Sequence, residues 1–253
     1  MVKFIIDNRE VKVEDGTTVL QAARSLGIEI PTLCYHEALE PYGACRVCLV
    51  EVATGNRSML TTSCTYPVWE GIVVRTESER VIKARRFMLE LLLARCPNVV
   101  KIQKLAEQLG VEKTRFKTAD EDCILCGLCV RVCREIIGSS AVGFVNRGIK
   151  RAVETPFEID SEVCIGCGAC AFVCPTGAIM IEDIKGYRKL DTWHTQLELA
   201  RCKECGNYFA PMVELNRLKE KVELPEEVFE LCSGCRRKRL RKELVKIEAK
   251  PGE

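Results

Sequence analysis

Alternating hydrophobic and polar positions open the chain and predict a small sheet. The segments KFIID and EVKVE both alternate and predict a β-hairpin with its turn at Asn8-Arg9. The next segment, DGTTVLQAARSLG, has helical spacing, with Thr17 or Thr18 as the N-cap and Gly27 as the stop. The apolar runs CLVEVA and IVVRT then predict further strands. Together these segments predict an α+β fold class.

A cysteine-bearing loop separates the predicted helix from the following strand. Strand, strand, helix, cysteine loop and strand is the order of a β-grasp ferredoxin. The four cysteines of residues 1–77 are Cys34, Cys45, Cys48 and Cys64. Their spacing, C-x10-C-x2-C-x15-C, differs from the plant-type C-x4-C-x2-C. Because a 2Fe-2S group needs four thiolates and residues 1–77 contain no others, we predict a β-grasp 2Fe-2S domain there.

Farther along the chain, the pattern C-x2-C-x2-C-x3-C occurs twice, and it is the ligand pattern of 4Fe-4S clusters. In two-cluster ferredoxins the last cysteine of each motif ligates the other cluster. The first predicted ligand set is therefore Cys123, Cys126, Cys129 and Cys174. The second predicted set is Cys164, Cys167, Cys170 and Cys133. We expect a two-cluster 4Fe-4S ferredoxin domain over residues 119–185 and a function in electron transfer.

These segments carry a family resemblance. Four segments carry the resemblance: the stretch DGTTVLQAARSLGIEIPTLCYHEALEPYGACRVCLVEV, the helix ARRFMLELLLARCP, and the motifs CILCGLCVRVCREIIG and CIGCGACAFVCPTGAI. The chain resembles the N-terminal region of the complex I large peripheral subunit, the small diaphorase subunit of NAD-reducing hydrogenases and the N-terminal region of multi-cluster iron hydrogenases. The resemblance covers residues 1–185, and it implies an electron-transfer module without selecting one enzyme.

One departure from these relatives concerns the segment after the β-grasp domain. The relatives usually carry a His-x3-Cys-x2-Cys-x5-Cys site there for a further 4Fe-4S cluster, whereas this chain reads ARCPNVVKIQKLAEQLG. Only Cys96 is present, and one thiolate cannot hold a cubane. We therefore predict that this cluster is absent, that residues 78–118 form a helical connector with a helix ended by Gly110, and that Cys96 is a buried free thiol.

The C-terminal segment contains a fourth cysteine set. It comprises Cys202, Cys205, Cys232 and Cys235, two C-x2-C pairs separated by 26 residues. Four thiolates in two chelating pairs suit tetrahedral zinc, and Cys205-Gly206 resembles a zinc-ribbon knuckle. We predict a small zinc-ribbon-like domain over residues 186–253. A further 4Fe-4S cluster uses the same thiolates and is the alternative at this site.

Composition and the remaining motifs narrow the possible functions. The 17 cysteines fall mainly in C-x2-C pairs, which favours metal binding over disulfides. Without a signal peptide or a long apolar segment, the sequence predicts a cytoplasmic protein with no membrane span. Neither G-x-G-x-x-G after a strand nor a P-loop occurs, so no nucleotide site is expected. His36 is interpreted as a surface residue beside the cysteine loop, with an effect on the potential or proton exchange of the 2Fe-2S site as the alternative, and His194 is not expected to be a ligand.

We therefore predict the non-catalytic iron-sulfur subunit of a cytoplasmic, multi-subunit NAD(P)-linked oxidoreductase, with a hydrogenase, including the electron-bifurcating type, as first candidate. It relays electrons between a flavin and NAD(P) subunit and another redox centre on a catalytic subunit. A formate dehydrogenase or other NAD-linked dehydrogenase is the alternative within the same chemistry.

An iron-sulfur or zinc regulator that binds nucleic acid is the alternative of another class, because residues 236–242 are strongly basic. The small net charge of +2 disfavours this nucleic-acid-binding alternative. The interleaved Leu240, Leu244, Val245 and Ile247 predict an amphipathic helix packed on one side.

Overall fold

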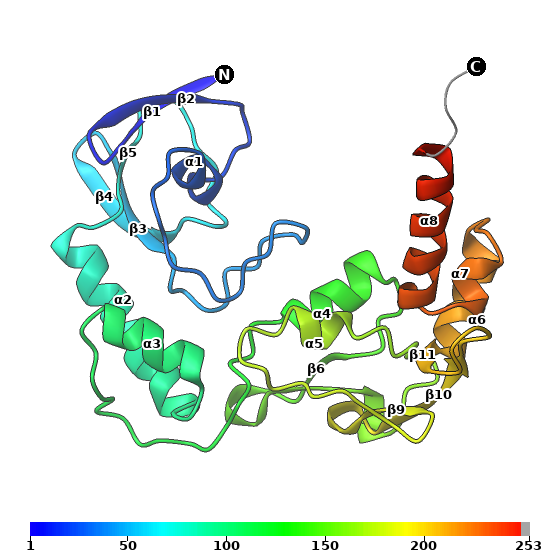
Figure 1. Ribbon diagram of the computed structural model, residues 1–253. Coiled ribbons are helices and arrows are strands. Elements are labelled where there is room, and N and C mark those ends of the chain that lie inside the picture. Colours follow the sequence, from blue (N-terminus) through cyan, green and yellow to red (C-terminus); the bar gives the residue numbers. More distant parts are fainter. Residues whose placement is uncertain (249–253) are drawn as a thin grey trace.

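The N-terminal unit is a five-stranded sheet with one helix packed on it, in a computed structural model that describes residues 1–248 (Figure 1). Its elements are β1 (Val2–Ile6), β2 (Arg9–Val13), α1 (Val19–Ser25), β3 (Leu49–Thr54), β4 (Arg57–Thr62) and β5 (Val73–Arg75). The strand order is β2-β1-β5-β3-β4, in which only β1 and β5 pair in parallel. This order is that of a β-grasp sheet.

The hairpin turn lies one residue earlier than the sequence predicts. Asp7 and Asn8 form it, with φ angles of 45° and 64°, and β2 already begins at Arg9. Asp and Asn tolerate the positive φ of a two-residue hairpin turn better than Arg does. Helix α1 follows the prediction more closely. The hydroxyl of Thr18 accepts a hydrogen bond from the Gln21 amide, and the Gln21 side chain accepts one from the Thr18 amide, which is a capping box.

Two helices, α2 (Glu79–Arg95) and α3 (Val100–Gln108), form the connector. The buried guanidinium of Arg85 on α2 donates two hydrogen bonds, of 3.0 and 2.7 Å, to the carbonyl oxygen of Leu49, so the connector is fixed to β3. Cys96 lies at the end of α2 and is fully buried. Burial raises the pKa of Cys96 to about 12, so this thiol keeps its proton at neutral pH.

The two C-x2-C-x2-C-x3-C motifs each fold as a loop followed by a short helix. The helical segments of this central unit are α4 (Leu128–Arg131), the π-helix η1 (Val132–Ile136), α5 (Ala169–Phe172) and the 3-10 turns η2 (Gly148–Lys150), η3 (Pro156–Glu158) and η4 (Asp191–Trp193). A two-stranded hairpin of β6 (Gly143–Val145) and β7 (Ala152–Glu154) lies between the motifs. The core beneath the motifs contains Val142, Ile179, Leu190 and Trp193.

A second sheet continues from the central unit into the C-terminal part. It consists of β8 (Glu182–Ile184), β9 (Tyr187–Leu190), β10 (Thr195–Arg201) and β11 (Tyr208–Pro211), in the order β11-β10-β9-β8. Helices α6 (Met212–Lys221), α7 (Glu227–Glu230) and α8 (Ser233–Glu248) follow. Residues 249–253 of the predicted C-terminal domain lie outside the described residues. Pro211 and Leu197 of this sheet contact the loop around Gly166, so the C-terminal part packs on the second cysteine motif.

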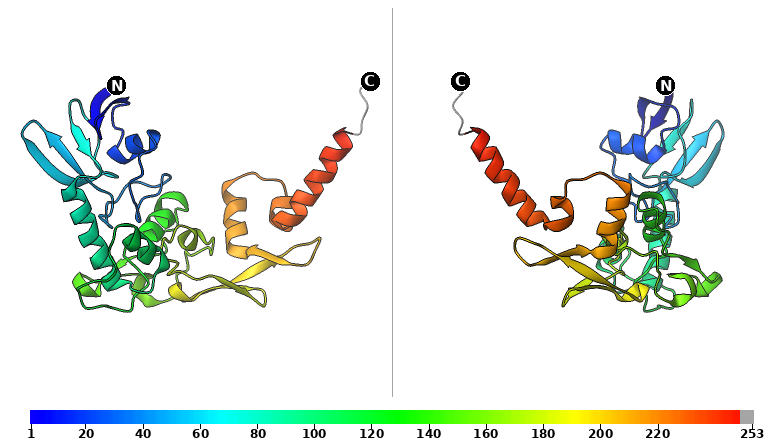
Figure 2. Two further views of the ribbon diagram at one scale, coloured as in Figure 1. Left: turned by 60° about the vertical axis from the view of Figure 1, so that its left-hand side comes forward. Right: turned by 90° about the vertical axis from the view of Figure 1, so that its right-hand side faces the viewer.

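Helix α8 extends away from the rest of the chain, on the side opposite the N-terminal sheet (Figures 1 and 2). Leu240 and Leu244 are 57% and 53% exposed, so the prediction that these two leucines pack against the protein is wrong. The reason is that α8 meets α7 near its own start and then leaves the surface. The side chains of Val245 and Ile247 lie outside the described residues. No helix within residues 1–248 combines the length and apolar character needed to cross a membrane.

Candidate iron-sulfur and metal sites

The four cysteines of the N-terminal unit lie together as two pairs. Cys34 and Cys45 come from the loop after α1, and the Cys45 amide donates a hydrogen bond to the Cys34 sulfur at 3.4 Å. Cys48 immediately precedes β3, Cys64 follows β4, and their sulfurs are 3.4 Å apart. All four side chains are buried. The antiparallel pairing of β3 with β4 therefore joins two cysteines that are distant in sequence.

Within each pair of this set, one thiol has a lowered pKa and the other a raised pKa. The side-chain hydrogen bond with Cys45 lowers the pKa of Cys34 to about 6, and the hydrogen bond with Cys64 lowers the pKa of Cys48 to about 6. The same hydrogen bonds raise the pKa of Cys45 and of Cys64. Ligation by all four thiolates must therefore release protons from the raised thiols, which couples metal binding to pH.

The eight cysteines of the two ferredoxin motifs border two neighbouring cavities. One cavity is lined by Cys123, Cys126, Cys129 and Cys174. The other is lined by Cys164, Cys167, Cys170 and Cys133. In each case the last cysteine of one motif stands with the first three cysteines of the other motif.

Backbone amides and glycines shape these cavities. The amides of Leu125 and Ala141 donate hydrogen bonds to the sulfurs of Cys123 and Cys133 at 3.4 and 3.3 Å. Gly166 has a φ of 65°, and a Cβ there would lie 2.6 Å from the Leu197 side chain, so only glycine fits at this close approach. Amides aimed at sulfur stabilise negative charge, which suits the anionic clusters that four thiolates form.

Burial raises the pKa of most of these thiols, so they ionise less readily without a metal. It raises the pKa of Cys126 and of Cys170 to about 11 in each case. Cys174 differs, because hydrogen bonds from the hydroxyl and amide of Thr176 outweigh its burial and lower its pKa. The donor set and its amide environment fit iron-sulfur groups, whose positive ions supply the charge that keeps buried thiolates deprotonated.

Trp193 is a residue of this region that sequence reasoning missed. Its side chain lines both ferredoxin cavities and is only 2% exposed. Its indole Nε1 donates a hydrogen bond to the Cys170 sulfur at 3.4 Å. Trp193 stands outside every cysteine motif, in the turn between β9 and β10, so no spacing rule marks it.

The C-terminal cysteines form the most compact of the four sets. The sulfurs of Cys202, Cys205, Cys232 and Cys235 all lie within 4.8 Å of one another. The Cys205 and Cys232 sulfurs are 3.7 Å apart. Ligands of one tetrahedral zinc at ~2.3 Å from the metal stand roughly 3.8 Å apart, so the set fits a single ion. Amide hydrogen bonds from Cys205 and Cys232 lower the pKa of Cys202 to about 6, which favours the thiolate.

Neither histidine belongs to a thiolate set. His36 accepts a hydrogen bond at Nδ1 from the Ala38 amide, at 3.2 Å. His194 lies half exposed, with Nε2 3.7 Å from a carboxylate oxygen of Glu154. His36 is partly buried, whereas His194 is exposed.

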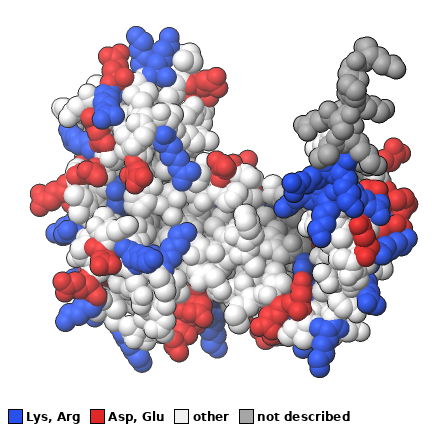
Figure 3. Space-filling view, in the orientation of Figure 1, with Lys and Arg blue, Asp and Glu red and all other residues white. Residues whose placement is uncertain are grey.

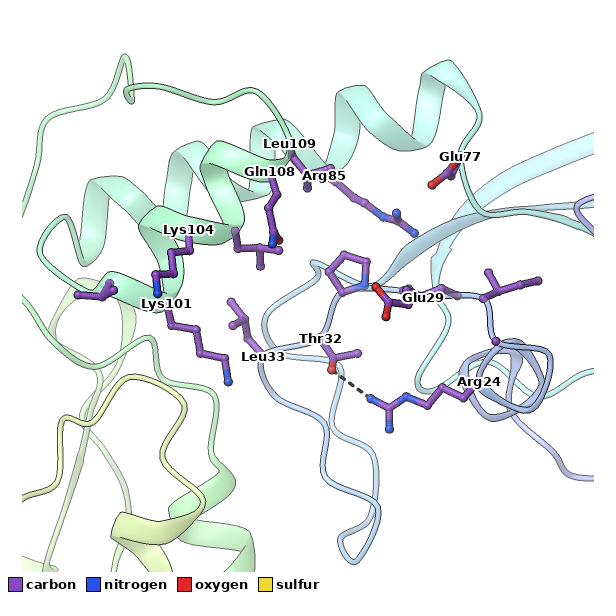
Figure 4. Close-up of a pocket in the computed structure, with 16 residues that line it drawn as sticks. Arg24, Glu29, Thr32, Leu33, Glu77, Arg85, Lys101, Lys104, Gln108 and Leu109 are labelled. Atoms are coloured by element: carbon purple, nitrogen blue, oxygen red, sulfur yellow. Dashed lines mark hydrogen bonds between the residues drawn. The ribbon is translucent and has the colours of Figure 1, made fainter.

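A further large cavity lies apart from the cysteine sulfurs. It has a volume of about 1170 Å³ and lies between α3 and the loop that precedes Cys34. Lys101 and Lys104 extend from α3 along one wall, and Arg24 on the facing side binds the Thr32 hydroxyl (Figure 4). Its lining contains no cysteine, so the cavity adds no thiolate ligand to the metal sites.

Comparison with known proteins agrees with these sites. Residues 1–79 match the 2Fe-2S iron-sulfur cluster binding domain, and residues 157–180 match the 4Fe-4S binding domain. The chain is 36% identical over 234 residues to an NADH-quinone oxidoreductase subunit of Rhizobium meliloti (strain 1021), covering 81% of this chain and 27% of that protein. It is also 36% identical over 212 residues to NADP-reducing hydrogenase subunit HndD of Solidesulfovibrio fructosivorans, covering 71% of this chain and 36% of that protein.

A solved structure extends the likeness to the fold. The crystal structure of an NAD+-reducing NiFe-hydrogenase in the H2-reduced state matches with a TM-score of 0.61 and 29% identity, over 70% of this chain and 86% of that chain. The predicted resemblance to complex I and hydrogenase subunits is thereby confirmed, as is a mixed α and β fold with 2Fe-2S and 4Fe-4S ferredoxin domains. The chain spans about a third or less of the length of these curated relatives.

The hydrogen bond from Trp193 predicts a measurable effect on the second ferredoxin site. Replacement of Trp193 by Phe removes the N–H donor to Cys170 and should make that site harder to reduce. Loss of about 1 kcal/mol of hydrogen bonding corresponds to a potential roughly 40 mV more negative for one electron. Redox titration followed by electron paramagnetic resonance measures this shift. Trp69→Phe, at an exposed position in the N-terminal unit, is the control and should leave the potential unchanged.

Proposed function

We propose that this chain is the iron-sulfur electron-transfer subunit of a cytoplasmic, multi-subunit NAD(P)-linked oxidoreductase, with a hydrogenase as the first candidate. Its described residues gather 16 of the 17 cysteines into four sets of four, two of which line cavities. Iron-sulfur groups supply one-electron transfer. The chain's own residues hold these groups, exclude water from them and fix their separation.

The observation that carries the proposal is that cysteines of the first two sets pack in one hydrophobic core. Cys34 and Cys45 of the N-terminal set lie in the same buried cluster as Cys126 of the first ferredoxin set. Trp193 then borders both ferredoxin cavities. A series of adjoining thiolate sets suits electron relay, whereas sites that serve only to stabilise separate domains have no need to adjoin.

We assign ligands according to this arrangement. In the 2Fe-2S site, Cys34 and Cys45 hold one iron, and Cys48 and Cys64 hold the other. The first 4Fe-4S site uses Cys123, Cys126, Cys129 and Cys174. The second 4Fe-4S site uses Cys164, Cys167, Cys170 and Cys133. The pairing of close sulfurs supports the first assignment, and the lining of the two cavities supports the others.

Zinc is the proposed metal of the C-terminal set. A cubane spreads its four thiolates around a body several atoms wide, whereas one ion draws them together. Sulfurs within 4.8 Å of one another favour the single ion. Cys202 follows the strand that ends at Arg201, Cys235 lies on α8, and both are buried. A zinc ion bound by both would therefore fix the C-terminal helices to the sheet. A fourth iron-sulfur cluster, of the 4Fe-4S type, stays the alternative.

The proposed partners are a flavin and NAD(P) subunit and a catalytic redox subunit. Proteins similar to this chain are named as subunits of NADH-quinone oxidoreductase, NADPH-Fe(3+) oxidoreductase and NADP-reducing hydrogenase. A hydrogenase is placed first because both a hydrogenase subunit and a hydrogenase structure are among the similar proteins. A formate dehydrogenase or other NAD-linked dehydrogenase is the second candidate, since the same relay serves any electron donor.

The nucleic-acid-binding alternative has less support. Lys and Arg side chains gather on α8, but acidic side chains stand beside them (Figure 3). Arg239 is paired with Glu204 and Glu227 at 3.1 and 2.8 Å, so part of the positive charge is already compensated. Phosphate binding requires a continuous basic surface, and an intermixed surface weakens it.

The metal content of the anaerobically purified chain tests the cofactor assignment. One 2Fe-2S and two 4Fe-4S groups correspond to about ten iron atoms per chain, together with one zinc. We expect this ratio from quantitative metal analysis. About fourteen iron atoms without zinc would instead place a third cubane at the C-terminal cysteines.

The relay assignment predicts the redox behaviour of the isolated chain. Because its sequence contains no recognisable flavin or nicotinamide motif, the purified chain should be reduced by dithionite but should not oxidise NADH or hydrogen. Absorbance bleaching and substrate-dependent dye reduction measure the two properties. Turnover of NADH or hydrogen by the rigorously purified chain would contradict a role limited to electron relay.

A matched pair of cysteine variants separates relay ligands from structural ones. Cys48→Ser should abolish or strongly weaken the 2Fe-2S paramagnetic signal, because serine oxygen is a poorer ligand for iron than thiolate sulfur. Cys205→Ser should leave all three iron-sulfur signals intact but lose zinc and loosen α8 toward proteolysis. An iron-sulfur signal lost from an assembled Cys205→Ser protein would mean that the C-terminal site is a cluster.

A further inference from the structure

Arg131 joins the N-terminal cysteine loop to the first ferredoxin loop. It is the last residue of α4, between Cys129 and Cys133 in sequence. Its Nη2 donates a 2.7 Å hydrogen bond to the carbonyl oxygen of Cys34, and its Nη1 donates to the carbonyl oxygen of Glu40. One side chain of the ferredoxin motif therefore binds the backbone of the loop that carries the N-terminal cysteine set, which approaches α4 in Figure 1.

The position of Arg131 is unusual for a charged side chain. The residue is 5% exposed, and its Nε is buried with no hydrogen-bond partner. Within residues 1–248, its polar partners are carbonyl oxygens, and no carboxylate forms an ion pair with it. The Glu135 carboxylate, which belongs to the same segment, instead accepts hydrogen bonds from Arg134 and from the Glu40 amide.

A buried guanidinium without a carboxylate partner carries a large desolvation cost. The ring of Tyr42, 5.7 Å from the guanidinium carbon, offers only a weak cation–π contact. The cysteine sets themselves supply negative charge nearby once their thiolates ligate a metal. The guanidinium lies beside one of these sets, because its Nη2 is 2.7 Å from the carbonyl oxygen of Cys34.

We infer that Arg131 is a positioning residue that fixes the 2Fe-2S loop against the first 4Fe-4S loop. Its positive charge favours the reduced state of the 2Fe-2S site. The inference rests on the proposed function, because it takes the four N-terminal cysteines as 2Fe-2S ligands. Reduction adds one electron to a site that is already anionic. A fixed positive charge in a buried environment stabilises the added negative charge, so it raises the reduction potential of that site.

This arrangement also bears on the connector, which has one cysteine and therefore cannot hold a cubane of its own. Cys34, Cys45 and Cys126 share a hydrophobic core with that cysteine, Cys96. Arg131 binds the N-terminal cysteine loop at this point, so the first two cysteine sets adjoin without a cluster in the connector between them.

Two variants of Arg131 separate its charge from its hydrogen bonds. Arg131→Gln keeps a hydrogen-bond donor but removes the charge, whereas Arg131→Lys keeps the charge but loses the forked geometry. The control is Arg134→Gln, because Arg134 is exposed and its charge is screened by solvent. The measurement is a redox titration of the full chain, followed through the 2Fe-2S paramagnetic signal.

We expect the reduction equilibrium constant of the 2Fe-2S site to fall about tenfold in Arg131→Gln, which is a shift of about 59 mV for a one-electron couple. Arg131→Lys should stay within about twofold of wild type, as should Arg134→Gln. An unchanged potential in cluster-containing Arg131→Gln would overturn the inference. An equal fall in Arg131→Lys would also overturn it, because the effect would then come from lost hydrogen bonds.

If Arg131→Gln does not retain its clusters, Arg131→Met, an uncharged side chain of similar length, takes its place, and the same tenfold fall is expected. An unchanged potential in Arg131→Met, or an equal fall in Arg131→Lys, contradicts the role of charge. The wild-type chain distinguishes this result from failure of the proposed function. A wild-type protein that contains no 2Fe-2S signal would contradict the proposed function, whereas intact wild-type signals with unaffected variants would contradict only the role of Arg131.

Discussion

Close approach of buried cysteine sulfurs is the interaction on which this structure depends. Every cysteine except Cys96 lies beside three others in a set of four, and thiolates so placed repel one another and lose hydration. Burial accordingly raises the pKa of sulfurs such as Cys126 and Cys170. Positive metal ions reverse this cost, so metal binding and the folding of the cysteine loops are thermodynamically linked.

The backbone of the cysteine loops is arranged to stabilise the negative charge of the thiolates. Amides donate to the sulfurs of Cys34, Cys123 and Cys133, and glycine at position 166 lets the loop approach Leu197 closely. These features lie on short helices and tight loops rather than on long regular elements. Such loops have few alternative contacts that would bring their cysteines together, so the metal-free chain should be loosest there.

Contacts between the units occur at the cysteine sets. Arg131 binds the loop of Cys34, Trp193 borders both ferredoxin cavities, and Leu197 packs on the second motif. Contacts at these points place the cysteine sets beside one another, which electron transfer requires and a storage or regulatory function does not. The similarity to hydrogenase and NADH-quinone oxidoreductase subunits agrees with such a construction.

The sequence by itself determined the ligand types, their grouping by spacing and most of the N-terminal elements, because three thiolates at intervals of three residues close locally on one site. Tertiary structure decided what local spacing cannot encode. It brought the side chain of Trp193 to Cys170 and that of Arg131 to Cys34, contacts between residues far apart in sequence. It also left Leu240 and Leu244 exposed, because an amphipathic pattern indicates that a helix has an apolar face but not whether this chain supplies a surface to cover it.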